Sequence, residues 1–336
     1  MSPPGVLFSP AVLVAAGAIG FNYSSTMAII FVNKLLFTRT AFPVLSLTAA
    51  HLFITACFTR GALAAGVFKA RESKIDRVIF LVALLQGAAI ALGQASLKLN
   101  SVSFFQLTKQ MQVPAVATIE YFALGRTLTR RKIGLLIAMT FGVCLANVSD
   151  VRFTILGAIV AIAGTASTSF EIVLYSNLQQ QHGWETLQLL YITMPYCTAF
   201  MTVIAMYVDA DAFESTGGGA PSMDSAGVAL FAASCALGMC VNVSSCFVGG
   251  KASALAYAML GLAKTITVLL LGVAFFDGVP TWRVGLGTSL ALVAIGAYAS
   301  VSLAERERAT REKNTHAKPG EELLPSTHAD ANAQRR

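Results

Sequence analysis

The chain has 336 residues, of which 55% are hydrophobic and only 12% are charged, and its formal net charge is +7. Soluble domains carry about 25% charged residues, and the mean hydropathy here is +0.67, so the composition excludes an ordinary soluble domain and indicates a polytopic membrane protein. The positive charge lies mostly in loops and in the C-terminal segment, where it bears on topology rather than on nucleic-acid binding. We find no phosphate-binding glycine loop, nucleophile elbow or metal-spaced Cys/His cluster, and therefore expect no enzymatic activity, no metal and no cofactor.

Hydropathy predicts ten membrane-spanning helices, each of roughly 18–28 residues, which is long enough to cross a bilayer. They cover residues 8–36, 42–64, 77–97, 102–124, 131–149, 154–178, 186–208, 225–248, 253–276 and 281–303. The first apolar run begins at about Val6 without a basic leader, which predicts an uncleaved first helix. Pro114 and Pro195 fall inside spans, where we expect kinks that free backbone groups beside a cavity. The charged, polar segment 305–336 is expected to be disordered.

The distribution of lysine and arginine over the loops predicts the orientation of the chain. Fifteen of these residues fall on one side of the predicted spans, against four on the other. The side with more positive charge faces the cytosol in membrane proteins, so we expect both termini to be cytosolic. The opposite side carries the acidic loop 209–224.

The two halves of the chain resemble each other at several polar and small residues. Five spans in each half is an odd number, so the second half must be inverted relative to the first. We therefore predict an all-α membrane protein with ten transmembrane helices in two inverted five-helix repeats, residues 1–149 and 150–304, and a substrate site at their interface near mid-membrane. The matched residues are Lys98, Lys109 and Gly142 in the first half and Lys251, Lys264 and Gly296 in the second.

Two lysines, Lys109 and Lys264, lie near the middle of apolar spans. A lysine at bilayer depth costs roughly 2.5–3.5 kcal/mol on insertion scales, so such residues face a protein interior or a watery cavity and commonly serve function. Two ammonium groups on symmetry-related helices suit a ligand with two neighbouring phosphates. The alternative is structural, with Lys109 paired to Glu120 or Glu171.

Other polar residues share a helix face with these lysines at 100° per residue. Glu171 could couple protons, balance the lysines or accept hydrogen bonds from sugar hydroxyls. Asn22, Asn33 and His51 are expected to make hydrogen bonds between helices. The candidate substrate-binding residues are Lys109, Lys264, Thr265, Tyr257, Gln106, Gln112, Glu171 and Asn242, with Gln188 and Tyr191 as weaker candidates.

Four stretches carry a resemblance to a known family. They are Asn33-Lys34 followed by Phe42-Pro43, the run SLKLNSVSFFQLTKQ (Ser96–Gln110), LLYITMP (Leu189–Pro195) and SALAYAMLGLAKT (Ser253–Thr265). On these residues the chain resembles the nucleotide-sugar transporter and triose-phosphate translocator family of the drug/metabolite transporter superfamily. Ser253–Thr265 is similar to the Lys-Thr subgroup, whose members move UDP-galactose, UDP-rhamnose, UDP-xylose and related sugars across the Golgi membrane. Glu171, Gln110 and Gln112 depart from the subgroup pattern.

The resemblance implies the drug/metabolite transporter fold, a central cavity in which Lys109 and Lys264 hold phosphate groups, and a location in the Golgi membrane. It implies an antiporter that imports a UDP-sugar into the Golgi lumen and exports a nucleoside monophosphate, with membrane lipid and no nucleic acid as further partners. The alternatives are a plastid-type phosphate or phosphosugar exchanger, a carrier of GDP-sugars, a membrane-embedded transferase and a non-transporting receptor. Thr265, where the plastid carriers have arginine, favours the nucleotide-sugar branch. The oligomeric state, including a homodimer, is left open.

Overall fold

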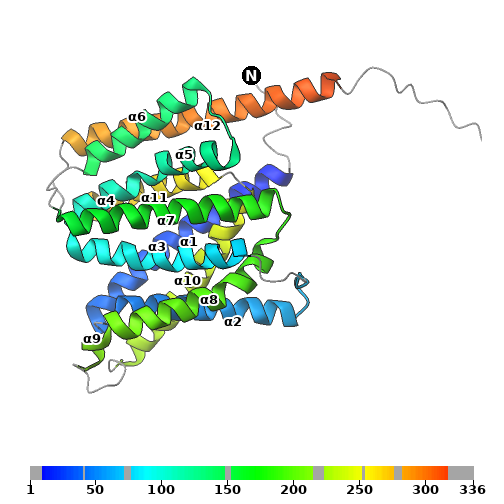
Figure 1. Ribbon diagram of the computed structural model, residues 1–336. Coiled ribbons are helices and arrows are strands. Elements are labelled where there is room, and N and C mark those ends of the chain that lie inside the picture. The colour runs from blue at the N-terminus through cyan, green and yellow to red at the C-terminus, as the bar shows by residue number, and fades with distance from the viewer. Residues whose placement is uncertain are drawn as a thin grey trace, which may run out of the picture.

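The computed structural model describes residues 10–40, 42–71, 77–147, 153–214, 223–251, 254–275 and 282–316, and over these ranges the chain is helical (Figure 1). The helices closely follow the predicted spans, apart from a short helix at Ala210–Glu214 in the predicted acidic loop and two larger differences. They are α1 (Pro10–Thr40), α2 (Val44–Ala64), α3 (Arg77–Leu99), α4 (Val102–Gln110), α5 (Gln112–Leu124), α6 (Arg130–Asn147), α7 (Ile155–Gln180), α8 (Thr186–Val208), α9 (Ala210–Glu214), α10 (Ser225–Lys251), α11 (Ala254–Phe275) and α12 (Trp282–His316).

The first difference is that the predicted span 102–124 consists of two helices, α4 and α5, which meet at Met111. The cause is Pro114, which has no N–H to donate to the carbonyl of Gln110 and whose ring crowds that carbonyl. The amide of Met111 donates to the carbonyl of Thr108 instead, at 3.1 Å, which tightens the turn before the break. The interruption predicted from Pro114 is therefore present, and it falls at Met111, two residues after Lys109.

The second difference is that α12 continues to His316, into the segment predicted to be disordered. Its sequence there is charged but rich in alanine, glutamate and arginine, which are strong helix formers. Contacts with the neighbouring α6 region also hold the extension, because Glu305 accepts a hydrogen bond from Thr129 at 3.0 Å and pairs with Lys132 at 2.6 Å. The nearby ammonium lowers the pKa of the Glu305 carboxyl. The rest of the predicted tail, 317–336, lies outside the described residues.

Six of the described helices are long and apolar enough to cross a membrane, namely α2, α3, α7, α8, α10 and α12. The chain is therefore a multi-pass membrane protein. The other predicted spans coincide with α1, the α4–α5 pair, α6 and α11. That these also cross the bilayer, for a total of ten, stays a prediction.

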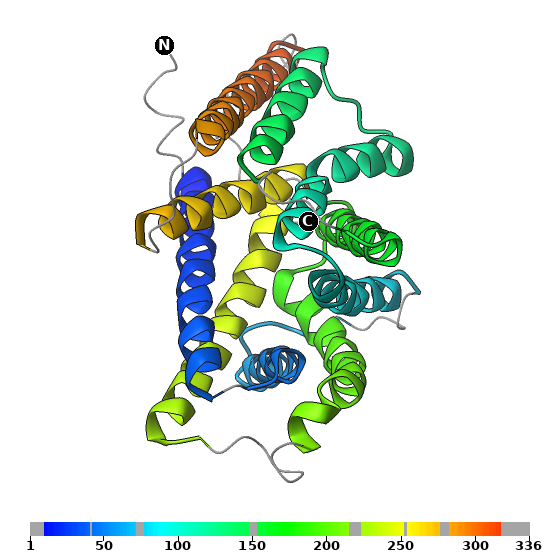
Figure 2. The same ribbon diagram turned by 90° about the vertical axis from the view of Figure 1, so that its left-hand side faces the viewer.

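The main helix pairs are α6 with α12, α3 with α7, α1 with α10, and α2 with α8. Figure 1 shows the α6–α12 pair at one edge of the bundle and the α2–α8 pair at the other, with α3 and α7 side by side between them. In the view turned by 90°, α1 (blue) is seen along its length, whereas α7 (green) is seen nearly end-on (Figure 2). Helix α1 therefore runs at a steep angle to α7.

Two apolar cores stabilise the bundle. One is centred on α2, α3 and α8, where Leu189, Met194 and Met201 are fully buried. The other joins α5, α6, α11 and α12 and includes Val116 and Met139. Helix α7 contributes residues to both cores. The space between them, beside α7, is where polar residues gather.

Two glycines let α6 and α12 approach each other closely. A Cβ atom added to Gly142 would lie 2.7 Å from the backbone oxygen of Gly287 and 2.8 Å from the backbone nitrogen of Ala291, and one added to Gly287 would meet the backbone oxygen of Gly142. Inside a bilayer the hydrophobic effect does not drive helices together, so helix pairs depend on the close van der Waals packing that small residues allow. Gly296, the sequence counterpart of Gly142, has open space around it, so the two glycines differ in packing.

We expect Gly287→Ala to destabilise the protein by about 1–3 kcal/mol, because a methyl group there displaces the backbone of α6. Gly285→Ala is the matched control on the same helix, since no atom lies within 4 Å of a Cβ added at Gly285. Thermal unfolding in detergent should show a lower midpoint for Gly287→Ala only. Equal midpoints for the two variants would contradict this crossing.

Candidate functional site

A polar cavity of about 570 Å³ lies between the two apolar cores. Its walls come from α3, α4, α5, α7, α8, α10 and α11. Six of the predicted site residues line it, and they belong to five of these helices. They are Lys109, Gln112, Glu171, Asn242, Tyr257 and Lys264.

The ammonium of Lys264 is held by two neutral oxygen atoms of α1. Its Nζ donates to Asn22 Oδ1 at 2.5 Å and to Thr26 Oγ1 at 2.9 Å. Asn22 is fully buried, and its Nδ2 donates to the hydroxyls of Ser244 at 2.8 Å and Ser245 at 3.0 Å on α10. An ammonium carries three N–H donors. Two of them orient the side chain and one is left for a ligand in the cavity.

Lys109 is accessible from the cavity and lies beside an aromatic ring. Its Nζ is 5.7 Å from the ring centroid of Phe105, which is within range of a cation–π contact. Lys264 lines the same cavity as Lys109. A site with two neighbouring cations and aromatic surface is suited to an anion with more than one charged group.

Neither lysine is neutralised by a carboxylate. Among the described residues, the ion pairs join Arg39 to Asp224, Arg126 to Glu120 and Lys132 to Glu305. Glu120 therefore pairs with Arg126, at 2.7 Å, instead of Lys109. No ion pair joins Glu171 to either lysine. The structural alternative for Lys109, pairing with Glu120 or Glu171, is wrong for this conformation.

Two predicted residues, Gln106 and Thr265, do not line the cavity. On α4 the lining residues are Phe105, Thr108 and Lys109, so Lys109 stands at the edge of the cavity-facing side. The prediction centred the polar face of the helix on Lys109. It therefore included Gln106, which lies on the side of Lys109 that faces away from the cavity. The Thr265 hydroxyl donates to the carbonyl of Gly261 at 3.1 Å, within its own helix.

Several other polar predictions can be compared with the structure. The interhelical roles of Asn33 and His51 are confirmed, since Ser234 Oγ lies 2.5 Å from Asn33 Oδ1 and 2.8 Å from His51 Nε2. Asn242 lines the cavity and also donates to Thr55 Oγ1 of α2 at 3.0 Å. The weaker candidates lie outside the cavity lining. Gln188 donates to the Lys69 carbonyl at 3.0 Å, and the Tyr191 ring packs against Phe68 and Arg60.

Asn22 and Thr26 are the residues of this site that the sequence did not reveal. Asn22 was expected to bond another helix, which is confirmed by its contacts with Ser244 and Ser245. Its contact with Lys264 spans 242 residues of sequence. Asn22 and Thr26 are one helical turn apart, so the sequence does indicate that their polar side chains share one face of the helix.

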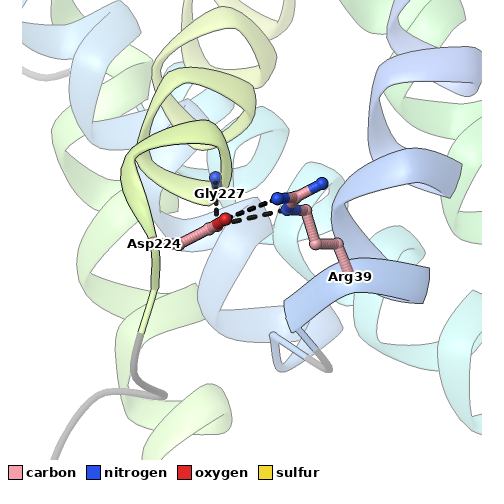
Figure 3. Close-up of polar contacts among 3 residues, drawn as sticks. All are labelled: Arg39, Asp224 and Gly227. Atoms are coloured by element: carbon pink, nitrogen blue, oxygen red, sulfur yellow. Dashed lines mark hydrogen bonds and ion pairs between the residues drawn. The ribbon is translucent and has the colours of Figure 1, made fainter.

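One end of the bundle is tied together by polar contacts between helix termini. Arg39, at the end of α1, donates to both carboxylate oxygens of Asp224, at 2.5 and 3.2 Å, and Asp224 also accepts from the backbone N–H of Gly227 at 2.8 Å (Figure 3). Asp209, at the end of α8, accepts from both the backbone N–H and the hydroxyl of Ser46, each at 2.8 Å. These contacts join α1 to α10 and α8 to α2.

The contact between α1 and α10 persists over the physiological pH range. Hydrogen bonds from Arg39 and then from the Gly227 amide lower the pKa of Asp224 from 3.8 to about 2. Because the folded-state pKa is depressed, the stabilisation is complete above pH 3.8 and is lost only as pH falls towards about 2. Asp224 also caps α10, since a carboxylate at a helix N-terminus satisfies a free N–H and favours the helix dipole.

The bundle of apolar helices encloses a cavity lined by two lysines that form no ion pair, which defines a multi-pass membrane protein with a charged internal cavity. The Triose-phosphate Transporter family model matches residues 13–299. The chain belongs to this family.

Several named proteins are similar to this chain in sequence, and one solved structure is similar to it in fold. The chain is 27% identical to UDP-xylose transporter 2 of Arabidopsis thaliana over 300 residues, covering 89% of this chain and 84% of that protein. It is 30% identical to UDP-xylose transporter 1 of the same plant, covering 76% and 75%. It is 27% identical to UDP-rhamnose/UDP-galactose transporter 2, also from Arabidopsis thaliana, over 90% of this chain and 87% of that protein. One crystal structure shares the fold, with a TM-score of 0.67 at 16% identity over 88% of this chain and 98% of that one.

We expect Asn22→Ala to weaken anion binding by about tenfold, because Lys264 loses its best acceptor and Ser244 and Ser245 lose a donor. Asn33→Ala is the matched control, since Asn33 bonds Ser234 away from the cavity lining. Nucleoside monophosphate binding to purified protein, measured by calorimetry, checks this. A loss of affinity in both variants would mean that Asn22 acts through general stability.

Proposed function

We propose that the chain is an alternating-access antiporter that carries a UDP-sugar into the Golgi lumen in exchange for a nucleoside monophosphate. The residues that bind the substrate are the six cavity-lining candidates, with Lys109 and Lys264 on the phosphates. Asn22 and Thr26 hold Lys264 in place for this contact.

The observation that carries the proposal is the pair of lysines in one cavity without carboxylate partners. Closing and dehydrating the empty cavity would leave two buried charges uncompensated, which is costly. A bound anion cancels these charges and lowers the cost. The loaded carrier therefore changes conformation faster than the empty one, and this couples import to export.

The relatives favour a nucleotide sugar over a small phosphate ester. Those of known substrate are named as UDP-xylose and UDP-rhamnose/UDP-galactose transporters. Membership of a transporter family favours a carrier over a transferase. The second candidate is a phosphate or phosphosugar exchanger, which the family's description favours. GDP-sugar carriage is a third possibility within the same mechanism.

Helix packing supports two inverted repeats with alternating access between them. In chain order, α1, α2, α3 and α6 of the first half correspond to α7, α8, α10 and α12 of the second half. If each helix is exchanged with its counterpart, the α1–α10 pair becomes the α7–α3 pair, and the α2–α8 and α6–α12 pairs stay the same. A two-fold relation between the halves would give this pattern. The positive charge of the loops orients both termini to the cytosol, so the end tied by Arg39 and Asp224 faces the Golgi lumen.

Reconstituted liposomes test the proposal. Liposomes loaded with UMP should take up UDP-galactose, UDP-xylose or UDP-rhamnose much faster than liposomes without nucleotide. Lys109→Gln and Lys264→Gln should each reduce exchange at least tenfold, because an uncompensated phosphate charge remains in the cavity. Lys98→Gln is the control, since Lys98 lies exposed at the end of α3.

Equally fast uptake into empty and loaded liposomes would contradict exchange. Phosphate or triose phosphate exchange without any nucleotide exchange would select the second candidate. Competition by a panel of nucleoside monophosphates identifies the base, with UMP expected to compete best and GMP expected to do so if the passenger is a GDP-sugar.

A further inference from the structure

Glu171 is a carboxylate in the cavity that the phosphate-binding lysines do not use. It lies on α7 in a row of cavity-lining residues with Gly164, Thr168 and Tyr175. Among the described residues no hydrogen-bond donor or cation pairs with it. A half-buried carboxylate without partners is unfavourable unless a ligand supplies the donors.

Glu171 and Lys109 lie at different levels along the cavity. Thr165 Oγ1 donates to the carbonyl of Thr108 at 3.2 Å, so this part of α7 lies beside Lys109. Glu171 follows six residues later, which at 1.5 Å per residue is about 9 Å further along the helix. The cavity therefore has a cationic level and a separate anionic level.

A ligand that reaches both levels carries phosphates at one end and hydrogen-bond donors at the other. An ionised carboxylate only accepts hydrogen bonds, and its two oxygens suit two neighbouring hydroxyls. Ribose presents such a diol, and dinucleotide-binding proteins use an acidic side chain to bind a ribose hydroxyl. Inorganic phosphate offers no such donors, so a cavity of this polarity favours a phosphate ester that also carries hydroxyl groups, as a nucleotide does.

We propose that Glu171 accepts hydrogen bonds from the ribose hydroxyls of the nucleotide whose phosphates lie on Lys109 and Lys264. The inference rests on the proposed exchange of a nucleotide sugar for a nucleoside monophosphate. Both passengers contain ribose and phosphate, whereas only one contains the transported sugar. A carrier that reloads with the monophosphate must recognise the part they share. Tyr175 and Tyr257, near Glu171, offer rings for the adjoining base.

The test compares three probes on purified protein by calorimetry: UMP, its 2′-deoxy analogue dUMP, and inorganic pyrophosphate. The wild-type protein should bind dUMP several-fold more weakly than UMP. Glu171→Gln should weaken UMP binding about tenfold, since hydrogen bonds to a charged group are lost, and dUMP binding by a smaller factor. Pyrophosphate should bind equally or more tightly, because it has no hydroxyls to lose and a repelling charge is gone.

Retained pyrophosphate binding also reports that Glu171→Gln folds, and Glu214→Gln, on α9 away from the cavity lining, is the control for the substitution itself. Equal losses for UMP and dUMP, or gains for all three probes, would overturn the proposal. Unchanged UMP binding with weaker UDP-sugar binding would overturn it in favour of the transported sugar. If wild-type protein binds pyrophosphate but no nucleotide, the proposed function fails as well. If wild-type binds UMP and dUMP equally, only the ribose inference fails.

Discussion

The structure depends on how two ammonium groups are accommodated inside an apolar bundle. A charge in such surroundings needs polar partners, and Lys264 obtains neutral ones from Asn22 and Thr26. These oxygens orient the ammonium without cancelling its charge. Lys109 keeps an aromatic neighbour and access to the cavity. The cations therefore stay available to an anion, which a carboxylate partner would have prevented.

The polar network of Lys264 also joins a helix of the first half of the chain to two helices of the second half. Through Asn22 it connects α11 to α1 and α10. At one end of the bundle the Arg39–Asp224 pair holds α1 and α10 together. That pair is exposed, with both side chains 52% accessible, and exposed ion pairs form and break at little free-energy cost. At the same end the Asp209 carboxylate is buried and accepts two hydrogen bonds from Ser46, so the contact between α8 and α2 is better shielded from water than the contact between α1 and α10.

Much of the fold follows from the sequence, because lipid demands long apolar helices and hydropathy locates them. The span predicted at 186–208 coincides with α8, and the two lysines in apolar runs do share a cavity. Gln106 does not line the cavity, because the residues of α4 that face it are Phe105, Thr108 and Lys109. The continuation of α12 to His316 depends on its helix-forming residues and also on the contacts of Lys132 and Thr129 with Glu305, which hydropathy does not reveal. Such contacts between distant segments, like that of Asn22 with Lys264, leave no local pattern in the sequence.

Phosphate binding by the two lysines is tested most directly by a structure of the protein with UMP bound. We expect phosphate oxygens within about 3 Å of the Nζ atoms of both Lys109 and Lys264, with Asn22 still accepting a hydrogen bond from Lys264. A phosphate bound elsewhere in the molecule, or either lysine paired with a carboxylate while the nucleotide occupies the cavity, would contradict it.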